Sequence, residues 1–329
     1  MTGSSGRTVL VTGAAGFIGA AVSEALLARG DAVVGVDNLN DYYDVGLKQA
    51  RLARLASNKA FHFHQIDISD RDRMLALAAD FPAITGIVHL AAQAGVRYSL
   101  INPYAYVTSN VMGQVVVLET ARALPALKHL VYASSSSVYG DNKKTPFAVG
   151  DTVDCPNSLY AATKRVDELF GHAYAHLYGL ASTGLRFFTV YGPWGRPDMA
   201  PMLFTRAILD GRPIRVFNGG DMWRDFTYID DIVDGVLRAL DRPATGTPPH
   251  AIYNLGNNKA EKLTDFIAEI EKALGIKAEM KMEPMQPGDV PITYADITAS
   301  QNALGFEPST PISVGVPKFV DWFKDYYRA

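Results

Sequence analysis

The sequence predicts an α/β protein with a doubly wound parallel sheet, followed by a smaller mixed α/β lobe. Short apolar and β-branched runs recur along residues 8–135, as in strands that are buried on both faces. Segments with helical periodicity alternate with these runs, which is typical of βαβ units. A glycine-rich turn joins the first strand to the first helix, with the sequence Gly13-Ala14-Ala15-Gly16-Phe17-Ile18-Gly19.

The elements of the sheet follow in order along the first part of the chain. The predicted strands are Thr8–Thr12, Ala32–Asp37, Phe61–Asp67, Gly86–Ala91 and His129–Ser135. The predicted helices are Ala20–Arg29, Asp70–Asp80, Tyr104–Ala123 and Leu159–Tyr178. Ligands of such sheets bind at the carboxyl ends of the strands, so residues that end a strand are the first candidates for a site.

The pattern changes after Tyr191. Residues 192–199 are rich in Gly, Pro and Arg, and we expect a loop there. Mixed elements follow, with predicted helices at 201–209, 230–240, 263–274 and 314–327 and predicted strands at 214–217 and 251–255. We therefore expect a larger domain over residues 1–191 and a smaller lobe over residues 192–329 that partly interleaves with it.

Composition excludes several classes of protein. The 329 residues are 48% hydrophobic and 20% charged, with a formal net charge of −3, so we expect no nucleic-acid partner. No apolar run approaches the length of a membrane span, and we expect no membrane partner. The single cysteine, Cys155, fits a reducing compartment and a cytoplasmic location. No metal is expected.

The glycine motif predicts a dinucleotide site. Gly13 permits a tight turn, Gly16 lets the backbone approach a pyrophosphate, and Gly19 permits close packing of helix on strand. The turn also contains Phe17 and Ile18, and the helix that follows it offers amides and a positive dipole end to the phosphates. A glycine-rich turn without a ligand is the alternative, which the position between a buried strand and a helix disfavours.

Three strand ends add to this cofactor site. Asp37 ends the second predicted strand, where a carboxylate binds ribose hydroxyls and repels a 2′-phosphate, which favours NAD over NADP. Asp67 and Ile68 end the third predicted strand and could contact adenine, although Asp67 could instead be the N-cap of the next helix. Leu90, Ala91 and Ala92 end the fourth predicted strand. The small alanine side chains there let a cofactor lie flat over the edge of the sheet.

A tyrosine and a lysine supply the candidate chemistry. Tyr160 and Lys164 are four residues apart and share one face of a predicted helix. A nearby positive charge favours a phenolate, so this pair can remove a proton from a sugar or alcohol hydroxyl. A serine from the preceding run Ser134–Ser137 can add a hydrogen bond to the substrate. Beside a nicotinamide, this trio becomes an oxidoreductase site.

Taken together, these motifs resemble the extended short-chain dehydrogenase/reductase superfamily, which has a Rossmann domain. The resemblance covers essentially the whole chain, and it lies in the branch of nucleotide-sugar epimerases and dehydratases. It implies that Tyr160 is the general base, that Lys164 binds the ribose, and that Ser135 is the catalytic hydroxyl, with Ser136 and Ser137 as alternatives. It also implies that Arg224 binds the substrate diphosphate, for which a guanidinium is suited.

Three segments are similar to the UDP-glucuronate 4-epimerases, namely 158–164, 183–200 and 285–290. Thr189 stands where many relatives that act on neutral sugars carry Asn, and its small hydroxyl leaves room for a sugar carboxylate. Arg196 is the other candidate contact for that carboxylate, with a solvated loop arginine as the alternative. Gln286 stands where relatives often carry Arg, and together with Asp289 it is expected near the substrate.

The resemblance implies inversion of C4 of UDP-glucuronate to UDP-galacturonate through a transient 4-keto sugar, with NAD tightly bound, and a role in polysaccharide biosynthesis. A UDP-glucuronate decarboxylase, a 4-epimerase of another UDP-sugar and a catalytically silent NAD-binding protein remain the alternatives. Relatives pair through two long helices, so the resemblance implies a homodimer through Tyr104–Ala123 and Leu159–Tyr178, with a core within one chain as the alternative role of their apolar residues.

Overall fold

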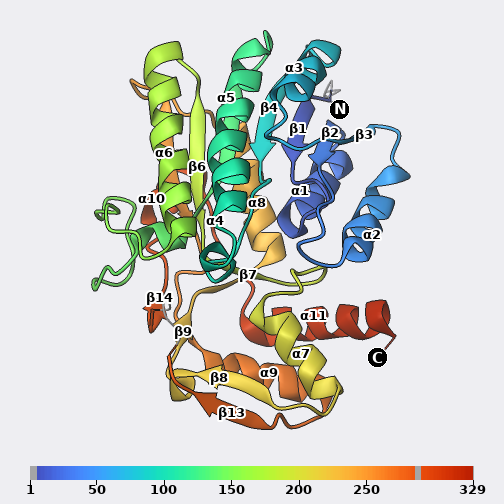
Figure 1. Ribbon diagram of the computed structural model, residues 1–329, viewed down its shortest axis with the longest axis vertical. Coiled ribbons are helices and arrows are strands. Elements are labelled where there is room, and N and C mark those ends of the chain that lie inside the picture. The colour runs from blue at the N-terminus through green and yellow to red at the C-terminus, as the bar shows by residue number, and fades with distance from the viewer. Residues whose placement is uncertain (1–5, 286–289, 329) are drawn as a thin grey trace.

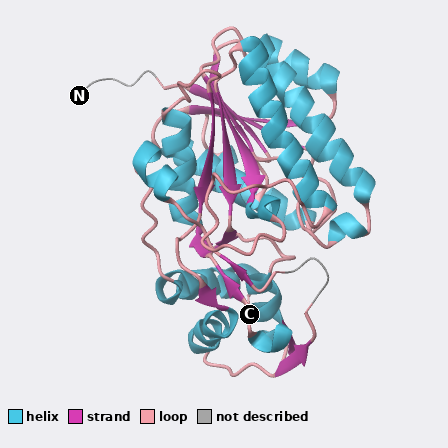
Figure 2. Cartoon of the chain, turned by 90° about the vertical axis from the view of Figure 1, so that its left-hand side faces the viewer, coloured by secondary structure: helices cyan, strands magenta, loops and turns pink. Residues whose placement is uncertain are grey.

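A parallel sheet forms the larger part of the computed structural model, which describes residues 6–285 and 290–328. Seven strands lie in the order β11-β6-β5-β4-β1-β2-β3, and all neighbours pair in parallel. These strands are β1 (Thr8–Thr12), β2 (Ala32–Asp37), β3 (Phe61–Gln65), β4 (Ile84–His89), β5 (His129–Ser135), β6 (Ser182–Phe187) and β11 (His250–Leu255). Helices cover both faces (Figures 1 and 2), which confirms the predicted doubly wound fold.

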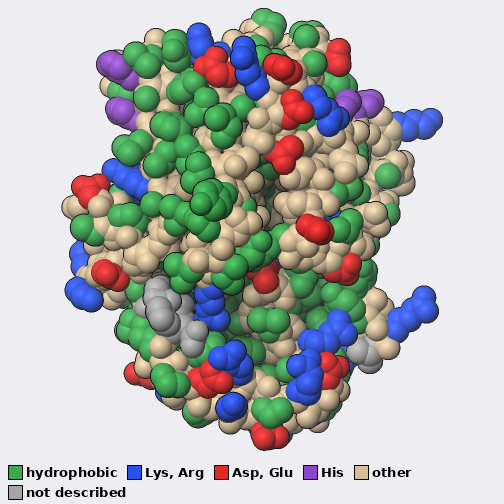
Figure 3. Space-filling view, viewed as in Figure 1, with side chains coloured by type: hydrophobic (Ala, Val, Ile, Leu, Met, Phe, Trp, Pro, Cys, Tyr) green, Lys and Arg blue, Asp and Glu red, His purple; other side chains and the backbone are tan. Residues whose placement is uncertain are grey.

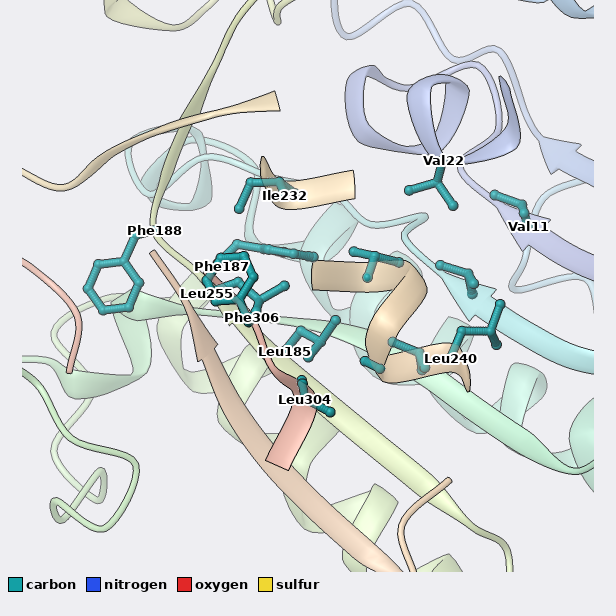
Figure 4. Close-up of a cluster of buried hydrophobic side chains, with 14 of the residues drawn as sticks. Val11, Val22, Leu185, Phe187, Phe188, Ile232, Leu240, Leu255, Leu304 and Phe306 are labelled. Carbon is teal, nitrogen blue, oxygen red and sulfur yellow. The ribbon is translucent and has the colours of Figure 1, made fainter. Parts of the chain in front are cut away.

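The two helical layers bury separate apolar clusters against the sheet. One face carries α3 (Arg71–Asp80), α5 (Gly113–Ala123) and α6 (Leu159–Tyr178). The other face carries α1 (Phe17–Ala28), α2 (Val45–Ala56), α8 (Ile229–Asp241) and α10 (Thr298–Leu304). Figure 4 shows the second cluster, in which side chains of β1, β6 and β11 meet those of the covering helices. Burial on both faces explains why the strands are almost continuously apolar.

The smaller lobe has its own apolar cluster beneath the sheet (Figure 1). Its main pair of strands is β8 (Ile214–Phe217) with β13 (Met280–Glu283), and these are covered by α7 (Ala200–Leu209), α9 (Leu263–Leu274) and α11 (Ile312–Tyr327). Short strands lie between the lobes, namely β7 (Thr189–Tyr191), β9 (Trp223–Arg224), β10 (Phe226–Tyr228), β12 (Glu261–Lys262) and β14 (Ile292–Thr293). Among the described residues there are also 3₁₀ turns, namely η1 (Tyr98–Leu100), η3 (Ser136–Tyr139) and η4 (Asn218–Gly220).

The chain passes between the two lobes more than once. Residues beyond 191 return to the large sheet, because β11 pairs along β6 and α8 packs against α1. The smaller lobe is therefore built from segments separated by sheet elements. The division at residue 191 stays a prediction.

One predicted helix is interrupted, which corrects the expectation of a continuous helix over Tyr104–Ala123. The segment consists of α4 (Pro103–Tyr106), a π-helical stretch η2 (Val107–Met112) and then α5. Inside η2, the buried side chain of Asn110 bonds both the amide and the carbonyl of Gln93. The wider turn lets Asn110 reach the loop after β4, so a tertiary contact accounts for the irregularity.

Other element bounds also differ from the prediction. α1 begins at Phe17, three residues earlier than expected, because Gly16 is extended at the N-cap and its carbonyl accepts the amide of Ala20. α2 and β6 were not predicted, whereas β5 and α6 have the predicted bounds. In the described part of the chain, none of the helices combines the length and apolarity that a membrane span needs.

A buried ion pair fixes α6 to the sheet. Arg186 on β6 donates through Nε and Nη2 to the two carboxylate oxygens of Glu168 on α6, at 2.8 and 2.9 Å. Ser134 on β5 donates to the same carboxylate at 2.6 Å. Burial raises the pKa of Glu168, but these partners outweigh it and hold the pKa below its usual value.

We expect Glu168→Gln to lower the free energy of unfolding by about 3 kcal/mol, because it leaves the buried Arg186 charge without its counter-ion. The control is Glu24→Gln, which breaks an exposed pair with Arg54 and should cost less than about 1 kcal/mol. Urea unfolding followed by circular dichroism measures both. Equal losses in the two variants would contradict the importance of this buried pair.

Candidate active site

One cavity of about 440 Å³ lies at the carboxyl edge of the large sheet, between the two lobes. Every predicted site residue that the structure describes borders it. These residues are Gly13, Gly16, Phe17, Ile18, Gly19, Asp37, Asp67, Ile68, Leu90, Ala91, Ala92, Ser135, Ser136, Ser137, Tyr160, Lys164, Thr189, Arg196 and Arg224. Gln286 and Asp289 lie outside the described residues.

The glycine turn is packed so closely that side chains are excluded. A Cβ on Gly19 would lie 2.0 Å from the carbonyl oxygen of Gly13. Gly13 has a φ of +72°, and a Cβ there would lie 2.8 Å from the amide nitrogen of Ala91. The turn, the start of α1 and the end of β4 are therefore in backbone contact. This leaves the N-terminus of α1 open towards the cavity, where it fits a diphosphate.

Asp37 ends β2, and its side chain is bonded both to the glycine turn and to the segment that follows β2. Its carboxylate accepts from the amide of Ala15 at 3.2 Å and from the amide of Leu39 at 2.9 Å. A carboxylate has about four acceptor positions, so capacity for ribose hydroxyls remains. The carboxylate, the glycine turn and the helix N-terminus together form a donor and acceptor set that fits NAD.

Asp67 lies in a turn after β3 and is not a helix cap. Its Oδ1 accepts from the amide and hydroxyl of Ser69, and its Oδ2 accepts from Asn38 at 2.8 Å. Burial raises the pKa of Asp67, but these hydrogen bonds outweigh it and lower the pKa below its usual value. The N-cap of α3 is Asp70, which accepts from Arg73, so the N-cap alternative for Asp67 is wrong.

Lys164 is buried at the junction of α6 and β5. Its ammonium donates to the carbonyl of Ala133 at 2.9 Å and to the carboxylate of Asp167 at 3.0 Å. Burial raises the pKa of Asp167 to about 6 although Lys164 opposes the shift. Tyr160 lies one turn earlier, half-buried, with its ring edge-on to Tyr106 at 6.0 Å. Both side chains border the cavity, and the ammonium of Lys164 is held in place by its bonds to Ala133 and Asp167.

The serine run divides into two parts. Ser134 is buried and donates to Glu168, so its hydroxyl belongs to the core. Ser135 is the last residue of β5, and its Oγ accepts from the amide and the hydroxyl of Ser137. Ser135, Ser136 and Ser137 are all half-buried at the cavity. The choice among these three stays a prediction.

Two residues after β6 approach the cavity from the side of the smaller lobe. Thr189 begins β7, and its amide donates to Asp225 O at 3.0 Å. Arg196 donates through Nε and Nη2 to the carboxylate of Asp198 at 3.1 and 2.5 Å. Burial lowers the pKa of Arg196, but Asp198 outweighs it, with a smaller contribution from Tyr160, and the pKa lies above its usual value. Arg196 is thus a half-buried cation at the cavity that is paired with Asp198, and its role as a substrate contact stays a prediction.

Arg224 begins the crossing from β9 towards β10. Its Nη1 donates to the carbonyls of Trp223 and Pro291 at 2.9 and 3.1 Å. The neighbouring Asp225 is directed into the core, where it accepts from Thr227 and from two backbone amides. Arg224 borders the cavity while Asp225 holds the backbone beneath it.

The segment that follows β2 was missed at the sequence level. Asn38, Asn40, Tyr42, Tyr43 and Lys48 all border the cavity. Tyr42 donates to Asp198 at 3.2 Å, and burial together with that carboxylate raises the pKa of Tyr42 to about 12. The available signal was the run of polar and aromatic residues that comes directly after the strand-end aspartate.

Residues 9–256 match the model of the NAD dependent epimerase/dehydratase family. The chain belongs to this family. UDP-glucuronate 4-epimerase 1 of Arabidopsis thaliana is 50% identical over 98% of this chain and 78% of that protein. Protein CapI of Staphylococcus aureus is 46% identical over 97% of this chain and 99% of that protein.

Solved structures of the family extend the likeness to the whole fold. The UDP-glucuronic acid 4-epimerase of Bacillus cereus, in complex with UDP-glucuronic acid and NAD, is 34% identical with a TM-score of 0.90. The alignment covers 98% of this chain and 100% of that chain. The UDP-glucose 4-epimerase of Thermotoga maritima, with UDP-glucose, is 28% identical with a TM-score of 0.88 over the same shares. The predicted family and the Rossmann fold are confirmed.

We expect Gly19→Ala to destabilise the glycine turn, because its Cβ would lie 2.0 Å from backbone oxygen. The free energy of unfolding should fall by about 1–3 kcal/mol, the usual cost of overpacking, and the affinity for NAD should fall with it. Thermal unfolding with and without NAD measures both effects. Gly150→Ala is the control, since a Cβ there meets nothing within 4 Å. NAD stabilising Gly19→Ala as much as the wild type would contradict this role.

Proposed function

We propose that this chain is an NAD-dependent UDP-glucuronate 4-epimerase, which interconverts UDP-glucuronate and UDP-galacturonate. The observation that carries the proposal is the single cavity in which a cofactor-binding glycine turn, a Tyr–Lys pair and the fixed cation Arg196 meet. The likeness to epimerases of this substrate over nearly the whole chain supports it. NAD, when bound, supplies the hydride acceptor and donor for the sugar C4.

The protein's own part in the reaction is to move one proton and to hold the substrate. Tyr160 Oη removes the proton of the C4 hydroxyl. It returns this proton after the sugar has rotated and presents its opposite face. Lys164 keeps a positive charge one helical turn away, and Ala133 and Asp167 hold its ammonium. An ammonium has three donors, so one donor remains for the cofactor ribose. Ser135 is proposed to hydrogen-bond the C4 oxygen.

Substrate specificity is proposed to reside in residues from the smaller lobe and the loop that leads into it. Arg196 supplies a cation for the sugar carboxylate, and Thr189 supplies a small donor that leaves room for it. Arg224 is proposed to bind the diphosphate, because a guanidinium makes charge-assisted bonds to phosphate. A 4-keto uronate tends to lose CO₂, so the carboxylate must be held firmly enough to keep the sugar on the epimerisation path.

A homodimer is proposed through the outer face of α4, η2, α5 and α6. Large apolar side chains gather on this face (Figure 3). Those more than 45% exposed include Leu100, Ile101, Tyr104, Val107, Met112, Leu169, Leu177 and Tyr178. An apolar patch of this kind marks an interaction surface. A cytoplasmic location, for which the lone cysteine is the support, and a role in making uronate-containing polysaccharides are proposed with it.

The decisive experiment is proton NMR of UDP-glucuronate incubated with the purified protein. We expect UDP-galacturonate to appear without an added oxidant, because NAD is regenerated in every cycle. Formation of a UDP-pentose with release of CO₂ would reassign the protein as a decarboxylase. No change after addition of NAD, with UDP-glucose converted instead, would reassign it to a neutral sugar.

We expect Tyr160→Phe to lower the turnover number by about 10²–10⁴-fold, because the general base is lost. The ring is retained, so thermal unfolding and NAD content should match the wild type. The control is Tyr104→Phe, which removes a hydroxyl from an exposed ring of α4 and should leave turnover unchanged. Undiminished turnover in Tyr160→Phe would remove this residue from the mechanism.

A further inference from the structure

Arg51 is a buried cation that the proposed mechanism does not use. It lies on α2, in the cofactor-binding part of the chain, and its exposed fraction is 0%. A guanidinium has five N–H donors, and each of them is used here. Nε and Nη2 donate to Trp194 O, and Nη2 also donates to Gly195 O. Nη1 donates to Ala15 O and to Tyr43 Oη.

These acceptors come from two distant parts of the sequence. Ala15 lies inside the glycine turn, whereas Trp194 and Gly195 lie in the loop that reaches the smaller lobe. Arg196, which is proposed to bind the uronate carboxylate, is the next residue of that loop. The bonds are 2.6 to 3.1 Å long. One guanidinium therefore ties the cofactor turn to the backbone immediately before the sugar-binding cation.

The backbone at this tie is in an unfavourable conformation. Trp194 has a φ of +65°, which a bulky side chain rarely adopts. A strained backbone conformation of this kind persists only where several neighbouring contacts hold it in place. Residues with such conformations cluster at ligand sites. The ring of Trp194 packs on Trp322 and Tyr326 of α11, and the guanidinium of Arg54 lies over it at 4.8 Å. Ring packing fixes the side chain, and Arg51 fixes the carbonyl.

The hydrogen-bond acceptors of Arg51 indicate what its side chain does. The five N–H groups of Arg51 donate to three carbonyl oxygens and one phenol, and none of these acceptors is a carboxylate. A buried charge costs free energy unless it is fully hydrogen-bonded, and a pure packing role would be filled by an apolar residue. A fork of donors with fixed geometry is needed where several carbonyls must be held in a defined relative position.

Resting on the proposed function, we propose that Arg51 is a positioning residue for uronate recognition. It sets the place of Arg196 relative to the cofactor turn, so that the sugar carboxylate is bound where C4 faces the nicotinamide site. The role is selective, since the diphosphate is proposed to be bound by Arg224 and not by the loop that Arg51 holds. Loss of Arg51 should weaken binding of the uronate more than binding of UDP alone.

The test is Arg51→Lys in the full-length protein loaded with NAD. A lysine keeps the charge but cannot fork to three carbonyls. Calorimetry in a Tyr160→Phe background, where turnover is expected to be strongly reduced, measures the affinities for UDP-glucuronate and for UDP. We expect the affinity for UDP-glucuronate to fall roughly tenfold or more, as for a lost hydrogen bond to a charged group, with the affinity for UDP unchanged. In the active background, KM for UDP-glucuronate should rise more than kcat falls.

Arg29→Lys is the matched control. It removes the fork of another partly buried arginine of the same lobe, which pairs with Asp31 and Asp241 away from the cavity. This control should change neither affinity. Equal weakening of UDP and UDP-glucuronate in Arg51→Lys would indicate a merely structural role and would overturn the inference, as would no weakening of either.

Tyr43→Phe keeps the inference testable if Arg51→Lys does not fold. It removes one acceptor of Arg51 and retains the ring, so a smaller loss confined to UDP-glucuronate is expected. An unchanged ratio of the affinities for UDP-glucuronate and UDP in this variant would overturn the inference. Failure of the proposed function is distinguishable, because a wild-type protein that does not convert UDP-glucuronate would refute that function whatever the variants do.

Discussion

Backbone contact between the glycine turn, the start of α1 and the end of β4 is the constraint on which the site depends. Gly19 fits against Gly13 only because neither has a side chain, and Gly13 in turn lies against Ala91. Parallel strands end at one edge, so this contact opens a cavity at the same edge as β2, β5 and β6. Functional side chains from segments that are far apart in the sequence can therefore lie close together there.

Buried polar bonds hold the reactive helix in register with that edge. α6 is tied to β6 by Glu168 and Arg186, and to β5 by Lys164 and Ala133. Asn110 of the π-helical stretch binds Thr163 on α6 as well as the loop after β4. Few of these bonds involve water-exposed groups, so the low local dielectric strengthens them. The rigidity of this framework is what allows Tyr160 to project into the cavity at a defined position.

Substrate recognition has a different architecture from cofactor binding. The loop with Arg196 leaves the large sheet, meets α2 and α11, and only then enters the smaller lobe. Arg196 is bound to Asp198, and Asp198 is bound to Tyr42 of the segment after β2. Both lobes therefore determine where Arg196, the proposed contact of the sugar carboxylate, lies. A loop anchored in this way can present a charge with little conformational freedom, which is the condition for selecting one carboxylate geometry.

Local sequence patterns were sufficient to predict the fold class, the family and many of the residues that border the cavity, but not the segment after β2. Strand runs such as His129–Ser135 and the spacing of Tyr160 and Lys164 are local patterns, and α6 begins and ends where they predict. The remaining features depend on contacts between segments that are far apart in the sequence. The π-helical break depends on Asn110 meeting Gln93, and the importance of Arg51 depends on Ala15 and Gly195, 180 residues apart, sharing one guanidinium. Contacts between distant segments leave no periodic signal in the sequence, because their partners are chosen by packing and not by spacing.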